Sequence, residues 1–434
     1  MRDLAMVVLL PFLIYFSFKR AYIAAGLWLW TSAFKINQLI YGFASAITYN
    51  KFFALITIVS FISDKNKPKF KMDGLSGLVI LFFIWTTLST IFSNVYPATV
   101  WATWEMLMKI ILFYFFSIAI LHKKKHIEFF IWILIFSIGI LSAKEGVKFI
   151  VSGGSHRFTG IHGISGDNNI FGVMILIVLA LGLYLLTQIT NKKLKNAVSV
   201  GLMFMVLGLI ATYSRAGFIG LAILTLMAFK DSKKKIIWIL LIGCILFSAK
   251  SFMPEQWFNR MNTVEHAEDD GSFMHRVMVW KMCTVIAMKN PLLGEGFKAN
   301  EDLSIWQKYH EYYSLLDFIE TPEADYNESV RAAHSMYFQV LAEHGFVGLF
   351  LFLLILISAY LKLGIIKSRA KHNNMDDWVI QLVKKIRLAI LMYCITGGTV
   401  AVAYLDLFYS VLVIIYTLDH HIVAEKKQSK IIYR

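Results

Sequence analysis

The chain has 434 residues, of which 58% are hydrophobic and only 16% are charged, against roughly 25% charged residues in ordinary soluble domains. Its formal net charge of +15 would suit nucleic-acid binding in a soluble protein, but the mean hydropathy of +0.62 and the repeated long apolar runs indicate a polytopic membrane protein. The Lys and Arg residues lie in short loops between apolar runs, so they indicate cytoplasmic loops and contact with anionic lipid, with no nucleic-acid partner.

The first 63 residues hold apolar runs that are too short to pair securely as membrane spans. The first run has the composition of a signal peptide, but no small-residue cleavage site follows it, so we expect a retained span. Their lengths also fit re-entrant or tilted segments. These runs cover residues 4–17, 21–33, 36–48 and 52–63.

After residue 70, basic clusters divide the chain into pairs of apolar segments. If every cluster is cytoplasmic, each pair crosses the membrane and returns. We therefore expect an all-α polytopic integral membrane protein with about 12 transmembrane helices and both ends in the cytoplasm. The expected spans after residue 70 are 76–93, 101–121, 126–143, 168–188, 196–212, 214–229, 236–250, 335–363, 387–402 and 404–420.

This topology leaves two long segments outside, residues 144–167 and 251–334. The second is less basic than the cytoplasmic loops and contains several tryptophans and tyrosines, which favours a folded, partly helical cap. The expected divisions are 1–250 for the N-terminal transmembrane helices, 251–334 for the large external loop, and 335–434 for the C-terminal transmembrane helices with a short cytoplasmic tail.

Four arginines fall on the external side, where the positive-inside rule does not favour them: Arg157, Arg215, Arg276 and Arg331. An arginine at the centre of a membrane helix costs roughly 2.5–3.5 kcal/mol, and less near the interface. These side chains either snorkel to lipid phosphates and pair with loop acids, or converge on an anionic ligand. Guanidinium groups suit phosphate because they donate two parallel hydrogen bonds.

The segment around Arg276 predicts a helix over 274–289, with Ser272 as a candidate N-cap and a stop before Asn290 and Pro291. Arg276 then lies in the first helical turn, where the helix dipole does not favour a cation. The position therefore indicates that Arg276 has a partner.

His334 stands at the start of the expected span 335–363, and Glu343 follows about two and a half helical turns later. A purely structural role is one alternative for both residues, although a carboxylate inside a span needs a partner. Asp167, Asn168 and Asn169, at the start of the span 168–188, either cap that helix or face the same external cavity.

No nucleotide-binding, metalloprotease or serine-nucleophile motif occurs at a meaningful spacing. The three cysteines include no CxxC pair, so we expect neither a disulfide framework nor a metal site. We expect no cofactor.

Three segments together resemble the O-antigen ligase and O-antigen polymerase superfamily. They are "TYSRAGFIGLAIL" (212–224), "MHRVMVWKMCTVIAMKNPLLGEGF" (274–297) and "AHSMYFQVLAEHGFVGLFLFLLIL" (333–356). The N-terminal 30 residues further resemble the exosortase-associated branch, whose members are described as probable O-glycosylation ligases. The motif has Ser335 where Asn is frequent in the family.

The resemblance implies a multi-pass bacterial inner-membrane glycosyltransferase of the GT-C type, with its active site facing the periplasm. It implies a glycan donor carried on undecaprenyl diphosphate, a lipid A core or protein acceptor, and a metal-independent, inverting transfer. By similarity, Arg215 and Arg276 hold the diphosphate and His334 acts on the acceptor hydroxyl, with Arg157 a further diphosphate candidate. Candidates for supporting roles are Glu343, Arg331, Asn168 and Tyr337.

Two alternatives stay open. A chain-extending polymerase shares the same residues, although the single dominant external loop favours a ligase. A transporter of lipid-linked glycan would use arginines in the same way, but it would be expected to carry interrupted helices and paired half-structures, which the sequence does not reveal.

Overall fold

The computed structural model describes residues 2–34, 36, 40, 42–65, 67–68, 70–158, 167–231, 271–321 and 332–423, and these residues form helices and turns without a β-strand. The main helices are α1 (Arg2–Lys19), α2 (Ala21–Phe34), α3 (Tyr49–Ser63), α4 (Gly74–Ile91), α5 (Pro97–Ile120), α6 (Lys124–Leu134), α7 (Ile140–Val151), α8 (Asn168–Gln188), α9 (Lys192–Ile210), α10 (Arg215–Asp231), α13 (Gly271–Lys289), α14 (Leu303–Tyr309), α15 (Met336–His372), α16 (Asp377–Thr396) and α17 (Asp406–Thr417).

Among the described residues, 7 helices are long and apolar enough to cross a membrane, which fits a polytopic membrane protein. Two of these seven helices include a π-helical segment. Ile135–Gly139 joins α6 to α7, and Leu418–Val423 follows α17. The helices α2 and α3 are apolar but shorter. The seven cover 74–91, 97–120, 124–151, 168–188, 192–210, 336–372 and 406–423.

Most expected spans coincide with helices, and α8 has the predicted bounds. One prediction was wrong, since the span expected at 387–402 is instead α16, Asp377–Thr396. The run 36–48, which the sequence left unassigned as a span, includes a short 3-10 turn, Phe43–Ala46, among its described residues. The basic residues of α16 are part of the helix, and the helix ends where Gly397 follows Thr396. The predicted span 236–250 lies outside the described residues.

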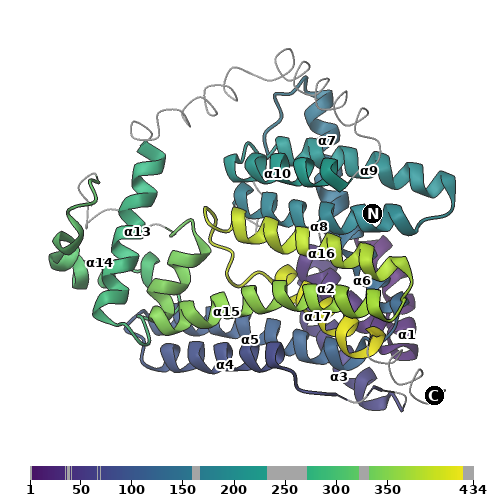
Figure 1. Cartoon of the computed structure of the whole chain (residues 1–434), viewed down its shortest axis with the longest axis horizontal. Helices are drawn as coiled ribbons and strands as arrows, with labels where there is room; N and C mark the ends of the chain where they lie inside the picture. The colour runs from purple at the N-terminus through teal and green to yellow at the C-terminus, as the bar shows by residue number, and fades with distance from the viewer. Residues whose placement is uncertain are drawn as a thin grey trace.

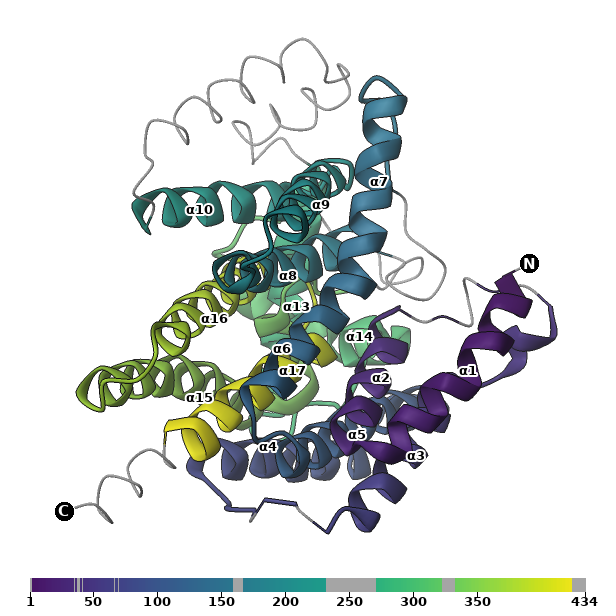
Figure 2. The same ribbon diagram turned by 90° about the vertical axis from the view of Figure 1, so that its right-hand side faces the viewer.

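The helices α4, α5, α8, α15 and α16 run side by side, while α13 and α14 stand at one end of this bundle (Figure 1). In the perpendicular view, α9 and α10 lie on the opposite side of the bundle from α4 and α5 (Figure 2).

The seam between α7 and α9 is a contact of backbone against backbone. A Cβ added at Gly146 would clash with the Phe204 carbonyl oxygen, and one added at Gly208 would clash with the Ser142 carbonyl oxygen. Small residues allow this approach, as is common where helices pack in membranes. The pair leads directly into the turns that carry two of the external arginines.

The helix α15 is broken at Gly345, whose φ of 67° and ψ of −171° are not helical. The turn after α13 inserts into this break: the Phe346 N–H donates to the Pro291 carbonyl at 2.9 Å, and the Gly296 N–H donates to the Glu343 carbonyl at 2.8 Å. These hydrogen bonds pair backbone groups that the kink leaves without helical partners, and they fix the C-terminal end of α13 against α15. The sequence showed no interrupted helix, so this break is a feature that sequence reasoning missed.

The segments that begin or end at the basic clusters meet at the other end of the bundle. The Lys124 ammonium, at the start of α6, donates to Gln188 at 3.0 Å and lies over the Trp378 ring of α16 at 5.0 Å. Lys362, late in α15, pairs there with Asp73 and Asp419. Residues next to several basic clusters therefore lie at this end of the bundle, while the predicted membrane topology stays a prediction.

Candidate functional site

The N-terminal ends of α8 and α15 meet through His334 and Asp167. His334 immediately precedes α15, and its Nδ1 lies 3.9 Å from the Asp167 Oδ2 at the start of α8. Its backbone has a φ of 44°, a left-handed conformation that is uncommon for a residue other than glycine and that often occurs at functional sites. His334 is thus held in an unusual geometry beside a carboxylate.

A hydrogen-bonded network fixes Asp167 from the other side. Its Oδ1 accepts the Asn169 N–H at 2.7 Å, which makes it the N-cap of α8, and the Asn169 side chain accepts the Ser214 hydroxyl at 2.8 Å. Asn168 donates to the Thr212 carbonyl at 2.5 Å. The start of α8 therefore caps its own helix and also holds the turn between α9 and α10.

One predicted arginine directly follows that turn, and a second lies against it. Arg215 is the first residue of α10, directly after Ser214, and the Arg157 guanidinium lies 5.8 Å from the centre of the Tyr213 ring. The Phe158 N–H donates to the Ala211 carbonyl at 2.8 Å, so the chain around Arg157 is fixed on the same turn. Burial raises the pKa of Tyr213, although Arg157 acts in the opposite direction.

The helix α13, which carries Arg276, contacts the segment before α15. One turn after Arg276, the Trp280 indole N–H donates to the Ala333 carbonyl at 2.7 Å, and its ring stacks on Phe338. The helix begins at Gly271, so Ser272 lies inside its first turn and Arg276 lies in the second. The predicted positions of the cap and of Arg276 were wrong, because the helix extends three residues further toward its N-terminus.

Two predicted supporting residues have their side chains bound elsewhere. The Glu343 carboxylate is fully buried and accepts the Lys298 N–H at 2.9 Å and the Tyr404 hydroxyl at 2.5 Å, inside the kink of α15. The Tyr337 hydroxyl donates to the Cys394 carbonyl at 2.8 Å and so ties α15 to α16. Arg331 lies outside the described residues.

The sequence left two roles open for Asp167, a helix cap or a place at the external cavity. Asp167 is the N-cap of α8, and it also lies beside His334. The contact with His334 was not predicted.

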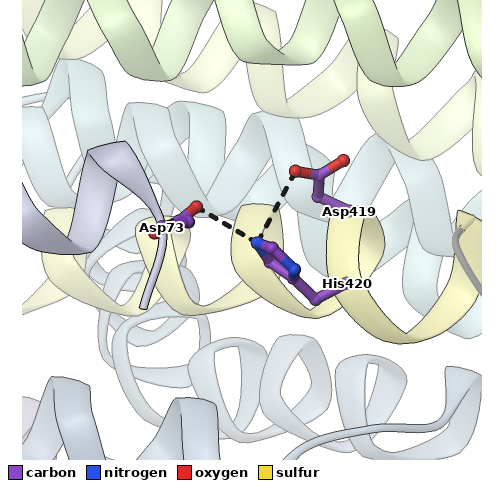
Figure 3. Close-up of side chains that lie close together, drawn as sticks. All are labelled: Asp73, Asp419 and His420. Atoms are coloured by element: carbon purple, nitrogen blue, oxygen red, sulfur yellow. Dashed lines mark hydrogen bonds and ion pairs between the residues drawn. The ribbon is translucent and has the colours of Figure 1, made fainter. Parts of the chain in front are cut away.

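At the opposite end of the bundle, Asp73, Asp419 and His420 form a group with a geometry that could hold a metal ion (Figure 3). The His420 Nε2 lies 3.3 Å from Asp73 and 3.7 Å from Asp419. The Lys362 ammonium already lies between both carboxylates, 3.0 Å from Asp419, and Arg369 contacts Asp419 at 2.9 Å. The carboxylates are thus neutralised by side chains, and the group serves as a salt-bridge network joining α4, α15 and the end of α17.

Comparison with known families divides the chain into two parts. Residues 200–353 match the family model described as O-antigen ligase, and residues 1–180 match that of a family of unknown function, DUF5935. No curated protein matches the chain. The first range contains Arg215, Arg276 and His334, and the second contains Asp167 and Arg157. The candidate site around His334 and Asp167 therefore combines residues from both parts.

Proposed function

We propose that this chain, whose residues 200–353 belong to the O-antigen ligase family, transfers a glycan from undecaprenyl diphosphate to a hydroxyl of the lipid A core oligosaccharide. The observation that carries the proposal is the meeting of His334 with Asp167 beside the turn that presents Arg215. This reaction requires a cationic side chain that binds the diphosphate close to a general base that accepts the proton of the acceptor hydroxyl.

In the proposed mechanism, Arg215 and Arg276 bind the donor diphosphate, with Arg157 contributing from the Tyr213 turn. As the bond between the anomeric carbon and the diphosphate oxygen breaks, negative charge builds up on the leaving diphosphate, and preorganised guanidinium groups stabilise it. Such groups supply this charge without a metal ion, so the transfer is metal-independent.

His334 takes the proton of the acceptor hydroxyl as its oxygen attacks the anomeric carbon from the opposite face, which inverts the configuration. Asp167 faces the Nδ1 of the ring at 3.9 Å and stabilises the imidazolium that forms. A histidine is suited to this step because its ordinary pKa is near 6.5. The left-handed backbone at His334 directs the ring before substrate arrives.

The proposed topology puts this site on the periplasmic side of the inner membrane. It has about twelve spans and both ends inside. Residues 144–151, which the sequence placed outside, continue the helix 124–151, so the outside segments become 152–167 and 251–334. The donor's polyprenyl tail stays in the bilayer, so its diphosphate is presented at the membrane surface, where the external ends of α8, α10 and α15 would lie.

The test begins with deletion of the gene and electrophoresis of the surface polysaccharide. Full-length chains left on the lipid carrier, with bare lipid A core, are expected for a ligase. Core carrying a single repeat would indicate a polymerase, and loss of glycan from protein alone would indicate a protein acceptor. In vitro transfer from a purified undecaprenyl diphosphate glycan should survive chelator; its disappearance would overturn the metal-independent mechanism.

A further inference from the structure

A cavity of about 460 Å³ lies between α2, α3, α5 and the start of α17. Its volume is in the range of sites that bind small molecules. Its walls include the aromatic rings of Trp28 and Phe113, and the residues named above for the glycan site take no part in its lining. The cavity is therefore a second candidate site, built largely from the N-terminal part of the chain.

Charges of both signs line this cavity. Lys51 is exposed and the Lys109 side chain is 36% exposed, so both ammonium groups lie toward the opening. Asp406 is half-buried, and its carboxylate accepts the Ser32 hydroxyl at 2.5 Å and the Leu407 N–H at 2.8 Å. A carboxylate has room for further donors, so Asp406 can bind a cation that enters the cavity. At the rim, Glu105 pairs with Lys109 at 2.6 Å.

The opening lies on a surface suited to lipid. Met106 lines the cavity and is 46% exposed, while Leu112 on the same helix and Leu55 on α3 are exposed at 42% and 61%. The neighbouring helices α2 and α3 have 14 and 15 residues, or about 21–23 Å, which is shorter than the roughly 30 Å hydrocarbon core. A polar cavity beside short helices and apolar side chains is open to a molecule that comes from the bilayer.

We propose that this cavity binds the headgroup of a zwitterionic phospholipid that carries a primary ammonium, such as phosphatidylethanolamine. In that headgroup the ammonium is at the tip, the phosphate follows, and the acyl chains come last. The cavity offers a partner for each part: the half-buried Asp406 for the ammonium, Lys51 and Lys109 for the phosphate, and exposed apolar side chains beside the cavity for the acyl chains. An anionic headgroup such as phosphatidylglycerol would satisfy the lysines but leave Asp406 without a cation.

The cavity also has a physical link to α15. Tyr404 forms part of its wall, and the Tyr404 hydroxyl donates to Glu343 in the kink of α15. A lipid bound in the cavity would therefore brace the loop before α17 and, through Tyr404, the kinked helix that begins at His334.

The experiment is native mass spectrometry of the full-length protein in detergent, titrated separately with phosphatidylethanolamine, phosphatidylglycerol and undecaprenyl phosphate. The expected result for the unaltered protein is binding of phosphatidylethanolamine at least tenfold tighter than the other two. Asp406→Asn should weaken phosphatidylethanolamine alone by at least about tenfold, because it removes the negative charge that pairs with the ammonium. The double variant Lys51→Gln, Lys109→Gln should weaken both phospholipids.

A matched control separates charge at the cavity from charge elsewhere. Lys195→Gln neutralises an exposed lysine of α9 that does not line the cavity. This variant should retain the lipid preference. Equal binding of the two phospholipids by the unaltered protein, or displacement of phosphatidylethanolamine by equimolar undecaprenyl phosphate, would overturn the proposal. His334→Ala should bind lipid normally, so this test is independent of the proposed glycan transfer.

Discussion

The two ends of α15 hold two different kinds of charged group. At the far end, Lys362 and His420 contact carboxylates at 3.0 and 3.3 Å, and the Lys362, Asp73 and Asp419 side chains are only 9–15% exposed. At the near end, His334 lies 3.9 Å from Asp167, and the two side chains are 33% and 28% exposed. The first group is a network of short ion pairs that stabilises the bundle, whereas the second is more exposed and its two side chains lie farther apart.

This comparison predicts a separation of effects. Substitutions at the far end should reduce stability and spare transfer, and substitutions at the near end should do the reverse. Gly345, between the two ends, should affect both.

The largest expected effect is on transfer by His334→Asn. Asparagine tolerates the left-handed backbone, so the variant removes the base while keeping the fold. Glycan transfer in isolated membranes should fall about 10²–10⁴-fold, with an unchanged unfolding midpoint. His372→Ala, at the exposed far end of α15, is the matched control and should retain full activity. Normal transfer by His334→Asn would remove His334 from the mechanism.

At the far end, Asp73→Asn should lower stability by about 3 kcal/mol, because it leaves Lys362 with one carboxylate partner fewer. Burial raises the pKa of the Asp73 carboxyl, but hydrogen bonds from His420, Lys362 and Ser76 outweigh it and hold the pKa well below its ordinary value.

The sign of the pH dependence follows from that lowered pKa. Asp73 stabilises the fold above the unfolded-state pKa of about 4, and the contribution is lost as the pH falls toward the folded-state value. The thermal unfolding midpoint of the unaltered protein should therefore fall as the pH decreases from about 5 to 3. The midpoint of Asp73→Asn should depend less on pH over this range. An identical acid dependence in the variant would contradict this account.

Arg215→Lys tests whether the near end recognises phosphate by its geometry. Lysine keeps the charge but loses the paired donors of guanidinium, so the KM for the lipid-linked donor should rise about tenfold. Arg157→Ala should have a smaller effect, because its guanidinium lies over Tyr213. An unchanged KM in Arg215→Lys would leave room only for a general electrostatic role.

Gly345→Ala should impair both stability and transfer. Its φ of 67° is unfavourable for alanine, and the new Cβ would lie 2.6 Å from the carbonyl oxygens of Pro291 and Leu292, so the cost should be about 1–3 kcal/mol. Gly364→Ala in the same helix meets no atom within 4 Å and should be neutral or stabilising. Denaturant unfolding of the two variants measures the difference in their free energies of unfolding. Equal values would contradict the interpretation that the turn after α13 inserts at Gly345.

The smallest effect is expected for Arg369→Gln. Its side chain is 58% exposed although it contacts Asp419 at 2.9 Å, and an exposed pair contributes about 0–1 kcal/mol. A loss as large as that of Asp73→Asn would mean that the far-end network acts as one unit.

The sequence predicted long helices best. Continuous apolar runs specify them locally, and α8 begins at Asn168 as expected. The prediction was wrong for the span expected at 387–402, because the charged residues before it have the composition of a loop although they are part of α16.

Long-range contacts explain the other omissions. The break at Gly345 depends on a turn more than 40 residues earlier in the chain, and the pairing of Asp167 with His334 joins residues from two different helices. Neither can be read from spacing along the chain. The sequence did identify His334, Arg157 and Arg215, which the fold brings to neighbouring turns, while their roles remain predictions.

The backbone contact between α7 and α9 has a consequence for how the polyprenyl chain of the proposed donor would travel. At Gly146 and Gly208 the two backbones are in direct contact, so no side chain at these positions can rotate aside to make a passage. Parting the two helices there would mean separating the backbones themselves. In the proposed mechanism, a hydrocarbon tail that enters beside Arg157 and Arg215 therefore passes on another side of the bundle.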